Sequence, residues 1–284
     1  MRVLAVVALL LLAYNARPAA ASCSVSASGV AFGNYTATNI VNITGTVSVT
    51  CTSGTAYHVG LNAGLATGAT ITNRSMTGPA SALLGYKLFS DSGRTANWGN
   101  TSGTGYVSGT GTGSAQTLTI YAQIPASEFV APGSYTDTVT INVTGGATAT
   151  TTFSVTSTVL SACTISANAL NFGTYSGVLI NSTSSVSVTC TKTTAYNVGL
   201  SAGLATGATV TNRSMTGPSS ALLGYKLFSN SGYTTNWGNT VGTDTLAGTG
   251  SGALQALSVY GQVPAGQYVR PGSYTDTITA TVTY

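Results

Sequence analysis

The sequence predicts an all-β protein of two tandem β-sandwich domains, the second of which lacks its final strand. Gly, Thr, Ser, Ala and Val dominate the composition, and only 5% of residues are charged, which favours strands and turns over helices. An internal repeat relates the two halves of the chain. The run PGSYTDT occurs at 132–138 and again at 271–277, but a further strand-like run follows only the first copy before the chain stops at Tyr284.

The first residues have the features of a secretory signal peptide. Arg2 precedes an apolar run of about a dozen residues, and three alanines at 19–21 form a small-residue cleavage site. We therefore predict a signal peptide over 1–21. No later stretch approaches the roughly 20 apolar residues of a membrane helix, so we expect an exported protein without a membrane anchor.

The charge pattern argues against a nucleic-acid partner. Removing Arg2 and Arg17 with the signal leaves 7 of the 9 basic residues against 5 acidic ones. The basic residues are scattered singly, whereas a phosphate-binding surface needs them clustered.

The repeat divides the mature chain into two domains, 22–160 and 161–284. Residues 51–145 match 190–284 at about two thirds of positions without a gap. Identical residues lie 139 positions apart: Cys51 and Cys190, Asn73 and Asn212, Trp98 and Trp237, Tyr135 and Tyr274. Each half is long enough to form its own core.

The four cysteines point to two disulfides, because they are even in number and the protein is exported. Three pairings are open, and Cys23 with Cys51 and Cys163 with Cys190 keep each repeat self-contained. A zinc site is the alternative, but the spacing contains no C-x-x-C and His58 is the only histidine. We predict no metal and no cofactor.

Alternating apolar and polar residues predict short antiparallel strands in a sandwich or barrel. The patterns lie at 44–51, 57–64, 82–90, 116–125 and 134–144, with turn residues between them. Tyr135, after Pro132 and Gly133, is a candidate corner tyrosine that bonds to nearby backbone.

A closing strand is expected only in the first domain. After a Gly-Gly turn, Phe153, Val155 and Val159 alternate with polar residues in the run 148–160. The second domain shares the preceding strand, but its sequence stops at Tyr284. We therefore expect an open edge and an apolar groove, a combination that invites strand addition from another chain.

The expected groove lies along the last strand of the second domain, 277–284. Ile278, Ala280 and Val282 are predicted to line its interior, and Tyr284 to end at its edge. At the other end of the mature chain, Ser22 alone precedes Cys23, so we expect no donor extension there. A subunit that receives a strand and donates none would occupy the tip of a head-to-tail polymer.

Both repeats resemble spore coat protein U domains, which occur in subunits of archaic chaperone-usher pili of Gram-negative bacteria. The resemblance covers nearly the whole mature chain. It rests on the paired cysteines at the start of each repeat, on LLGYKLFS followed by NWGN, and on PGSYTDT in the closing strand.

The resemblance implies immunoglobulin-like pilin domains and a two-domain tip adhesin whose first domain is self-complete. It implies a periplasmic pilus chaperone, an outer-membrane usher and the adjacent pilin as partners, with export through the periplasm to the cell surface. Attachment to a host or abiotic surface and biofilm formation would follow. The alternative is a secreted, spore-coat-like structural or surface-binding protein that is not assembled into pili.

An enzyme is not expected, because the groups that catalysis needs are scarce. Asn197 replaces His58 in the second repeat, and we expect Asp137 and Asp276 to bond turn backbone or to face solvent. Trp98 and Trp237, and likewise Arg74 and Arg213, occur in both repeats and are expected to pack and to hold turns.

The Gly-rich run 99–114 lacks the G-K-[ST] ending of a phosphate loop. Because it differs from its counterpart in the second repeat while its flanks do not, it is a candidate adhesive loop, with Tyr106 and Val107 as exposed apolar contacts.

Overall fold

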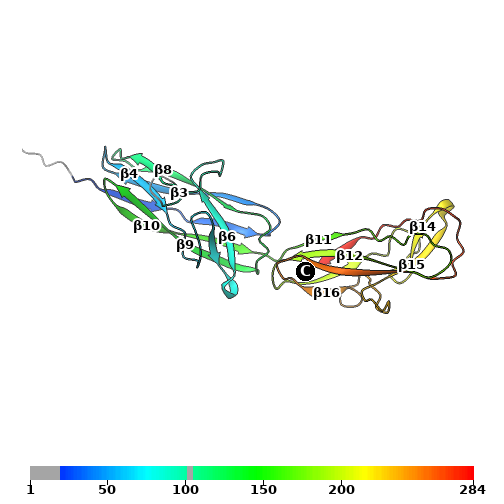
Figure 1. Cartoon of the computed structure of the whole chain (residues 1–284). Coiled ribbons are helices and arrows are strands. Elements are labelled where there is room, and N and C mark those ends of the chain that lie inside the picture. The colour runs from blue at the N-terminus through cyan, green and yellow to red at the C-terminus, as the bar shows by residue number, and fades with distance from the viewer. Residues whose placement is uncertain (1–19, 101–104) are drawn as a thin grey trace, which may run out of the picture.

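A computed structural model describes residues 20–100 and 105–284. The chain forms two β-rich units that follow one another along the long axis of the molecule (Figure 1). Residues 1–19 of the predicted signal peptide lie outside the described residues. Apart from two 3-10 turns, Pro79–Ser81 and Pro218–Ser220, the described elements are strands.

The first domain is a ten-stranded arrangement. Its strands are β1 (Cys23–Ala27), β2 (Val30–Tyr35), β3 (Val41–Cys51), β4 (Ala56–Leu61), β5 (Arg74–Thr77), β6 (Leu83–Phe89), β7 (Val107–Thr110), β8 (Gln116–Ile124), β9 (Gly133–Gly145) and β10 (Ala149–Val159). The strands pair in the order β1-β3-β8-β6-β5-β9-β10-β2, while β4 pairs with β7 and β9. The alternating patterns in the sequence therefore do form strands, and β10 is the predicted closing strand.

The second domain repeats this arrangement in part. Its strands are β11 (Cys163–Ala167), β12 (Ile180–Cys190), β13 (Ala195–Leu200), β14 (Arg213–Thr216), β15 (Leu222–Phe228), β16 (Leu246–Thr249), β17 (Gln255–Val263) and β18 (Ala280–Thr283). They pair as β11-β12-β17-β15-β14 and as β16-β13-β18. Among the described residues, no strand corresponds to β2 or to β10.

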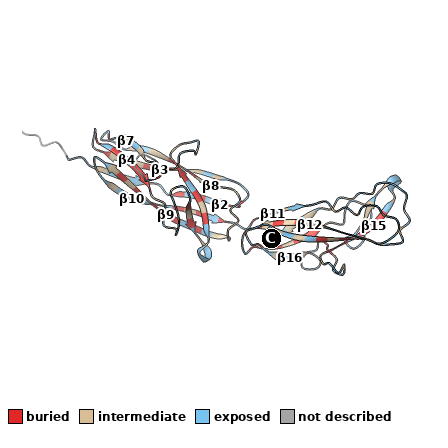
Figure 2. Cartoon of the chain, viewed as in Figure 1, coloured by how far each residue is buried: buried red, intermediate tan, exposed pale blue. Residues whose placement is uncertain are grey.

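Each domain has its own core, marked by the buried stretches of the strands in Figure 2. Alternate side chains of β9 are buried from Tyr135 to Val143, so the period of two in the sequence gives an inner and an outer face. Disulfides join Cys23 to Cys51 and Cys163 to Cys190, each between the first strand of a domain and its neighbour.

A buried arginine and tryptophan brace each core. The Trp98 indole donates to the Val59 carbonyl at 2.9 Å. The Arg74 guanidinium donates to the carbonyls of Leu61, Asn62, Ile71 and Trp98 at 2.7–3.1 Å. Arg213 and Trp237 repeat these bonds in the second domain. The expected packing role of the shared tryptophans and the turn-holding role of the arginines are confirmed.

The corner tyrosine is also present, since the Tyr135 hydroxyl donates to the Ala131 carbonyl at 2.7 Å. Its counterpart Tyr274 donates to the Arg270 carbonyl at 2.8 Å. These bonds fix the turn that precedes the last shared strand of each domain.

Glu128 and its counterpart Gln267 differ in charge at one half-buried position. Gln267 exchanges two hydrogen bonds with the Gly224 backbone. Loss of solvent raises the pKa of Glu128, and the Gly85 N–H opposes this shift. The Glu128 carboxyl therefore ionises at a lower pH in the unfolded chain than in the folded domain. For this reason the first domain should lose stability as the pH rises from about 4 through the raised pKa.

We therefore expect Glu128→Gln to raise the Tm of the first domain more at pH 7 than at pH 3, measured by calorimetry. An equal Tm difference at both pH values would contradict this prediction.

Candidate strand-binding groove

The first domain is completed by β10, which lies between β9 and β2. It runs antiparallel to β9, with Phe153 opposite Val139 and Val155 opposite Asp137. It runs parallel to β2, with Val155 opposite Val30. Phe153, Val155 and Val159 are at most 4% exposed, so the closing strand fills the space between its two neighbours with apolar side chains.

The same space is open in the second domain. The counterpart of the 13-residue β9 contains only the four-residue β18, and the counterpart of β2, residues 170–175, is not a strand. A cavity of about 1120 Å³ lies between these two segments. Among the described residues, no backbone hydrogen bond joins 167–175 to 272–280. This cavity is the groove in all that follows.

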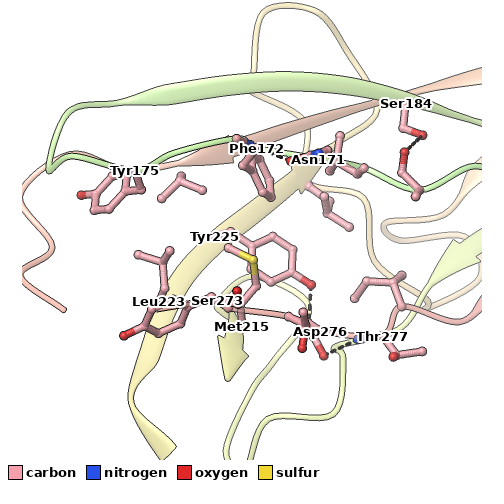
Figure 3. Close-up of a pocket in the computed structure, with 18 of the residues that line it drawn as sticks. Asn171, Phe172, Tyr175, Ser184, Met215, Leu223, Tyr225, Ser273, Asp276 and Thr277 are labelled. Atoms are coloured by element: carbon pink, nitrogen blue, oxygen red, sulfur yellow. Dashed lines mark hydrogen bonds between the residues drawn. The ribbon is translucent and has the colours of Figure 1, made fainter. Parts of the chain in front are cut away.

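Apolar side chains of the β2 counterpart form one wall of the groove. Leu170, Phe172 and Tyr175 line it and are half-buried, whereas Val30, Phe32 and Tyr35 at the equivalent positions of the first domain are at most 5% exposed. Figure 3 shows Phe172 and Tyr175 on one side of the groove and Tyr225 beyond Phe172. In the first domain, β10 covers the equivalent side chains of β2.

The residues of this wall are not among those predicted from the sequence to line the groove. The signal was available, because V-x-F-x-x-Y at 30–35 recurs as L-x-F-x-x-Y at 170–175. The pattern alone does not indicate a strand, because the spacing of Phe172, Gly173 and Tyr175 is as typical of a loop.

Two of the four predicted groove residues line the cavity. Ile278 and Ala280 do so, while Val282 is half-buried against the second core and Tyr284 is 58% exposed. The places of Val282 and Tyr284 along the groove stay predictions. β18 pairs with β13 along one edge, with Val282 opposite Val198, and its other edge is the one that β10 occupies in the first domain, where Ala149 lies opposite Val143.

A polar pair lies in the groove. The Tyr225 hydroxyl donates to the Asp276 carboxylate at 2.7 Å (Figure 3). The backbone N–H groups of Leu204 and Thr277 donate to its other oxygen. Burial, followed by this hydrogen bond, raises the pKa of Tyr225. With both oxygens engaged, Asp276 holds structure together, as Asp137 does with Tyr86. The expectation that these aspartates bond turn backbone is confirmed.

The candidate adhesive loop lies elsewhere, on the first domain, and residues 101–104 of it lie outside the described residues. Tyr106 and Val107 are half-buried rather than exposed. The Tyr106 ring stacks on His58, with ring centroids 5.8 Å apart, and Val107 packs against the first core.

No helix among the described residues has the length and apolar character to cross a bilayer.

Comparison with known proteins finds similarity to a curated protein and to solved structures. Protein U of Myxococcus xanthus is 37% identical over 155 residues, which cover 49% of this chain and 86% of Protein U. Among solved structures, one match is the crystal structure of the CsuC-CsuE chaperone-tip adhesion subunit pre-assembly complex from archaic chaperone-usher Csu pili of Acinetobacter baumannii. It matches with a TM-score of 0.56 and 22% identity, over 93% of this chain and 100% of that chain.

The structural match shows that the two domains have an immunoglobulin-like pilin fold. The Spore Coat Protein U domain matches twice, over residues 10–142 and 149–281. Neither that family nor this structural neighbour is an enzyme. The chain therefore belongs to the Spore Coat Protein U domain family, of which it carries two tandem copies.

Proposed function

We propose that this chain is a subunit of a chaperone-usher pilus whose second domain accepts a strand from another protein. The periplasmic chaperone supplies that strand first, and the adjacent pilin supplies it after assembly through the outer-membrane usher. The protein is thus exported through the periplasm to the surface of a Gram-negative cell.

One observation carries the proposal: the space that β10 fills in the first domain is an open apolar groove in the second. Because the two domains share about two thirds of their aligned residues, the groove retains the walls that recognise a strand. A strand placed there would pair with an unsatisfied backbone edge and cover half-buried aromatic side chains, two gains that drive strand addition.

We further propose that the subunit sits at the pilus tip and attaches the cell to a host or abiotic surface, which promotes biofilm formation. The self-complete first domain supports this, since β10 already fills the space that is open in the second domain. The likeness over the whole chain to a tip adhesion subunit supports it as well. Tyr106 and Val107 remain our candidates for the adhesive region, now with His58 beside them.

Co-expression of the full chain with the periplasmic chaperone of its own bacterium tests strand acceptance. We expect the wild type to co-purify with the chaperone and Ala280→Asp to lose it, because a carboxylate would project into the apolar groove. Thr281→Asp is the matched control, since Thr281 is exposed on the opposite face and should not affect co-purification.

The opposite result would favour the spore-coat-like alternative. If the full chain accumulates as a monomer without the chaperone, and both of its domains unfold cooperatively, the groove needs no donor. Immunogold labelling of isolated fibres tests the tip proposal separately, because label along the whole shaft would contradict it.

A further inference from the structure

The contact between the two domains, called the joint below, indicates how the second domain could contact a further subunit through the equivalent loop. We propose that the loop 264–270 of the second domain docks the disulfide end of the next pilin subunit, and that the backbone carbonyl of Tyr268 is its hydrogen-bond acceptor. This inference rests on the proposed function, because it requires a donor strand in the groove.

Within the chain, a loop of the first domain sits directly on the disulfide end of the second. The Phe129 carbonyl accepts the Lys192 N–H at 3.1 Å. The same carbonyl oxygen would lie 2.9 Å from a Cβ at Gly252, so the glycine leaves room for it. Figure 1 shows β10 leading straight across this joint into β11.

Burial shows that this joint covers the end of the second domain. Ser22 and Thr52 at the end of the first domain, and Ala162 and Thr191 at the end of the second, make the same pair of hydrogen bonds. Ser22 is nevertheless exposed and Thr52 half-buried, whereas Ala162 is 4% and Thr191 0% exposed. These hydrogen bonds are the same in both domains. The lower exposure of Ala162 and Thr191 therefore arises from the first domain, which packs over them.

Tyr268 is the counterpart of Phe129 and is 97% exposed. Phe129, in contrast, is half-buried and packs against the first core. A fully exposed tyrosine at a position that forms a joint in the other repeat is typical of an unoccupied contact surface.

The donor strand would deliver its own domain to this loop. In the first domain Val159, the last residue of β10, lies opposite Gly133, and Cys163 follows four residues later. Gly272 is the counterpart of Gly133 and adjoins the loop 264–270. Because four extended residues reach only about 13 Å, a donor in the same register must place its disulfide end beside Tyr268.

The joint also defines the chemistry of the partner surface. It should present a backbone N–H two residues after the second cysteine, as Lys192 does. It should also carry a glycine where a Cβ would strike the Tyr268 carbonyl, as Gly252 does at the internal joint.

A three-domain chain tests the inference. The full chain is extended after Tyr284 by a copy of 146–284 and closed by a further copy of 146–160. Tyr268→Cys in the middle domain is combined with Lys192→Cys in the appended copy. Backbone-bonded neighbours have Cα atoms about 5.5 Å apart, which a disulfide can span.

Phe129→Cys with Lys192→Cys at the internal joint is the positive control. Tyr268→Cys with Val241→Cys in the appended copy is the mismatched control, because Val241 is exposed on a different loop. Mass spectrometry of non-reduced peptides measures the yields, and calorimetry reports whether the middle domain has accepted its strand.

We expect the Tyr268–Lys192 disulfide to form in a yield comparable to that of the Phe129–Lys192 disulfide at the internal joint. The mismatched Tyr268–Val241 disulfide should not form. If the middle domain is stabilised by its strand but the Tyr268–Lys192 link is no more frequent than the mismatched one, docking is refuted while strand acceptance stands. A middle domain that gains no stability from the strand overturns both.

Discussion

Appending a copy of residues 146–160 after Tyr284 is expected to raise the Tm of the second domain by about 10 °C or more. In this variant Tyr284 takes the place of Gly145, and the appended strand can enter the groove in the register of β10. The copies of Phe153, Val155 and Val159 would leave water, and each such burial stabilises by about 1.5–3 kcal/mol. Backbone pairing along 272–280 adds to this gain.

Calorimetry of the full chain with and without the extension measures the effect. The matched control carries the same extension with Phe153→Ser and Val155→Asp in the copy, which keeps its length but places a carboxylate against Asp276. We expect this control to unfold like the wild type. A second-domain transition that both extensions shift equally would show that the added length, and not strand insertion, is responsible.

Arg74→Met is expected to destabilise the first domain by at least about 4 kcal/mol, because four backbone carbonyls lose their donors and each costs about 1–3 kcal/mol. Burial lowers the pKa of Arg74 to about 10, so the side chain remains protonated at neutral pH and all its donors are available. Methionine keeps much of the apolar volume, which limits the loss to the hydrogen bonds.

Chemical denaturation followed by near-UV circular dichroism measures this loss. Arg213→Met should impose a similar loss on the second domain, since its contacts are the same. Arg270→Met is the control, because Arg270 is exposed and its described side-chain bond is a single one to Ser219. A loss below about 1 kcal/mol in Arg74→Met would show that water replaces the guanidinium without penalty.

Some features could be predicted because they are local or repeated. Alternation at 134–144 and 148–160 gives strands whatever their neighbours are, and the 139-residue repeat implies that both domains share one sandwich. The closing strand β10 could be predicted for the same reason, since Phe153, Val155 and Val159 alternate with polar residues.

Other features depended on partners that the sequence does not link. Tyr86 and Asp137 lie 51 residues apart, and the Arg74 guanidinium reaches the Trp98 carbonyl 24 residues away. The side chains of Tyr106 and Val107 were expected to be exposed, but packing on His58 and on the first core half-buries them.

By itself, the sequence determined the all-β class, the duplication and the faces of the long strands, because these follow from a period of two and from identity between repeats. Only the tertiary structure decided that β10 lies parallel to β2 and that 170–175 forms the second wall of the groove. The physical reason is that alternation tells which way a side chain points. Which strand lies beside it is set by backbone pairing and packing between residues far apart in the chain.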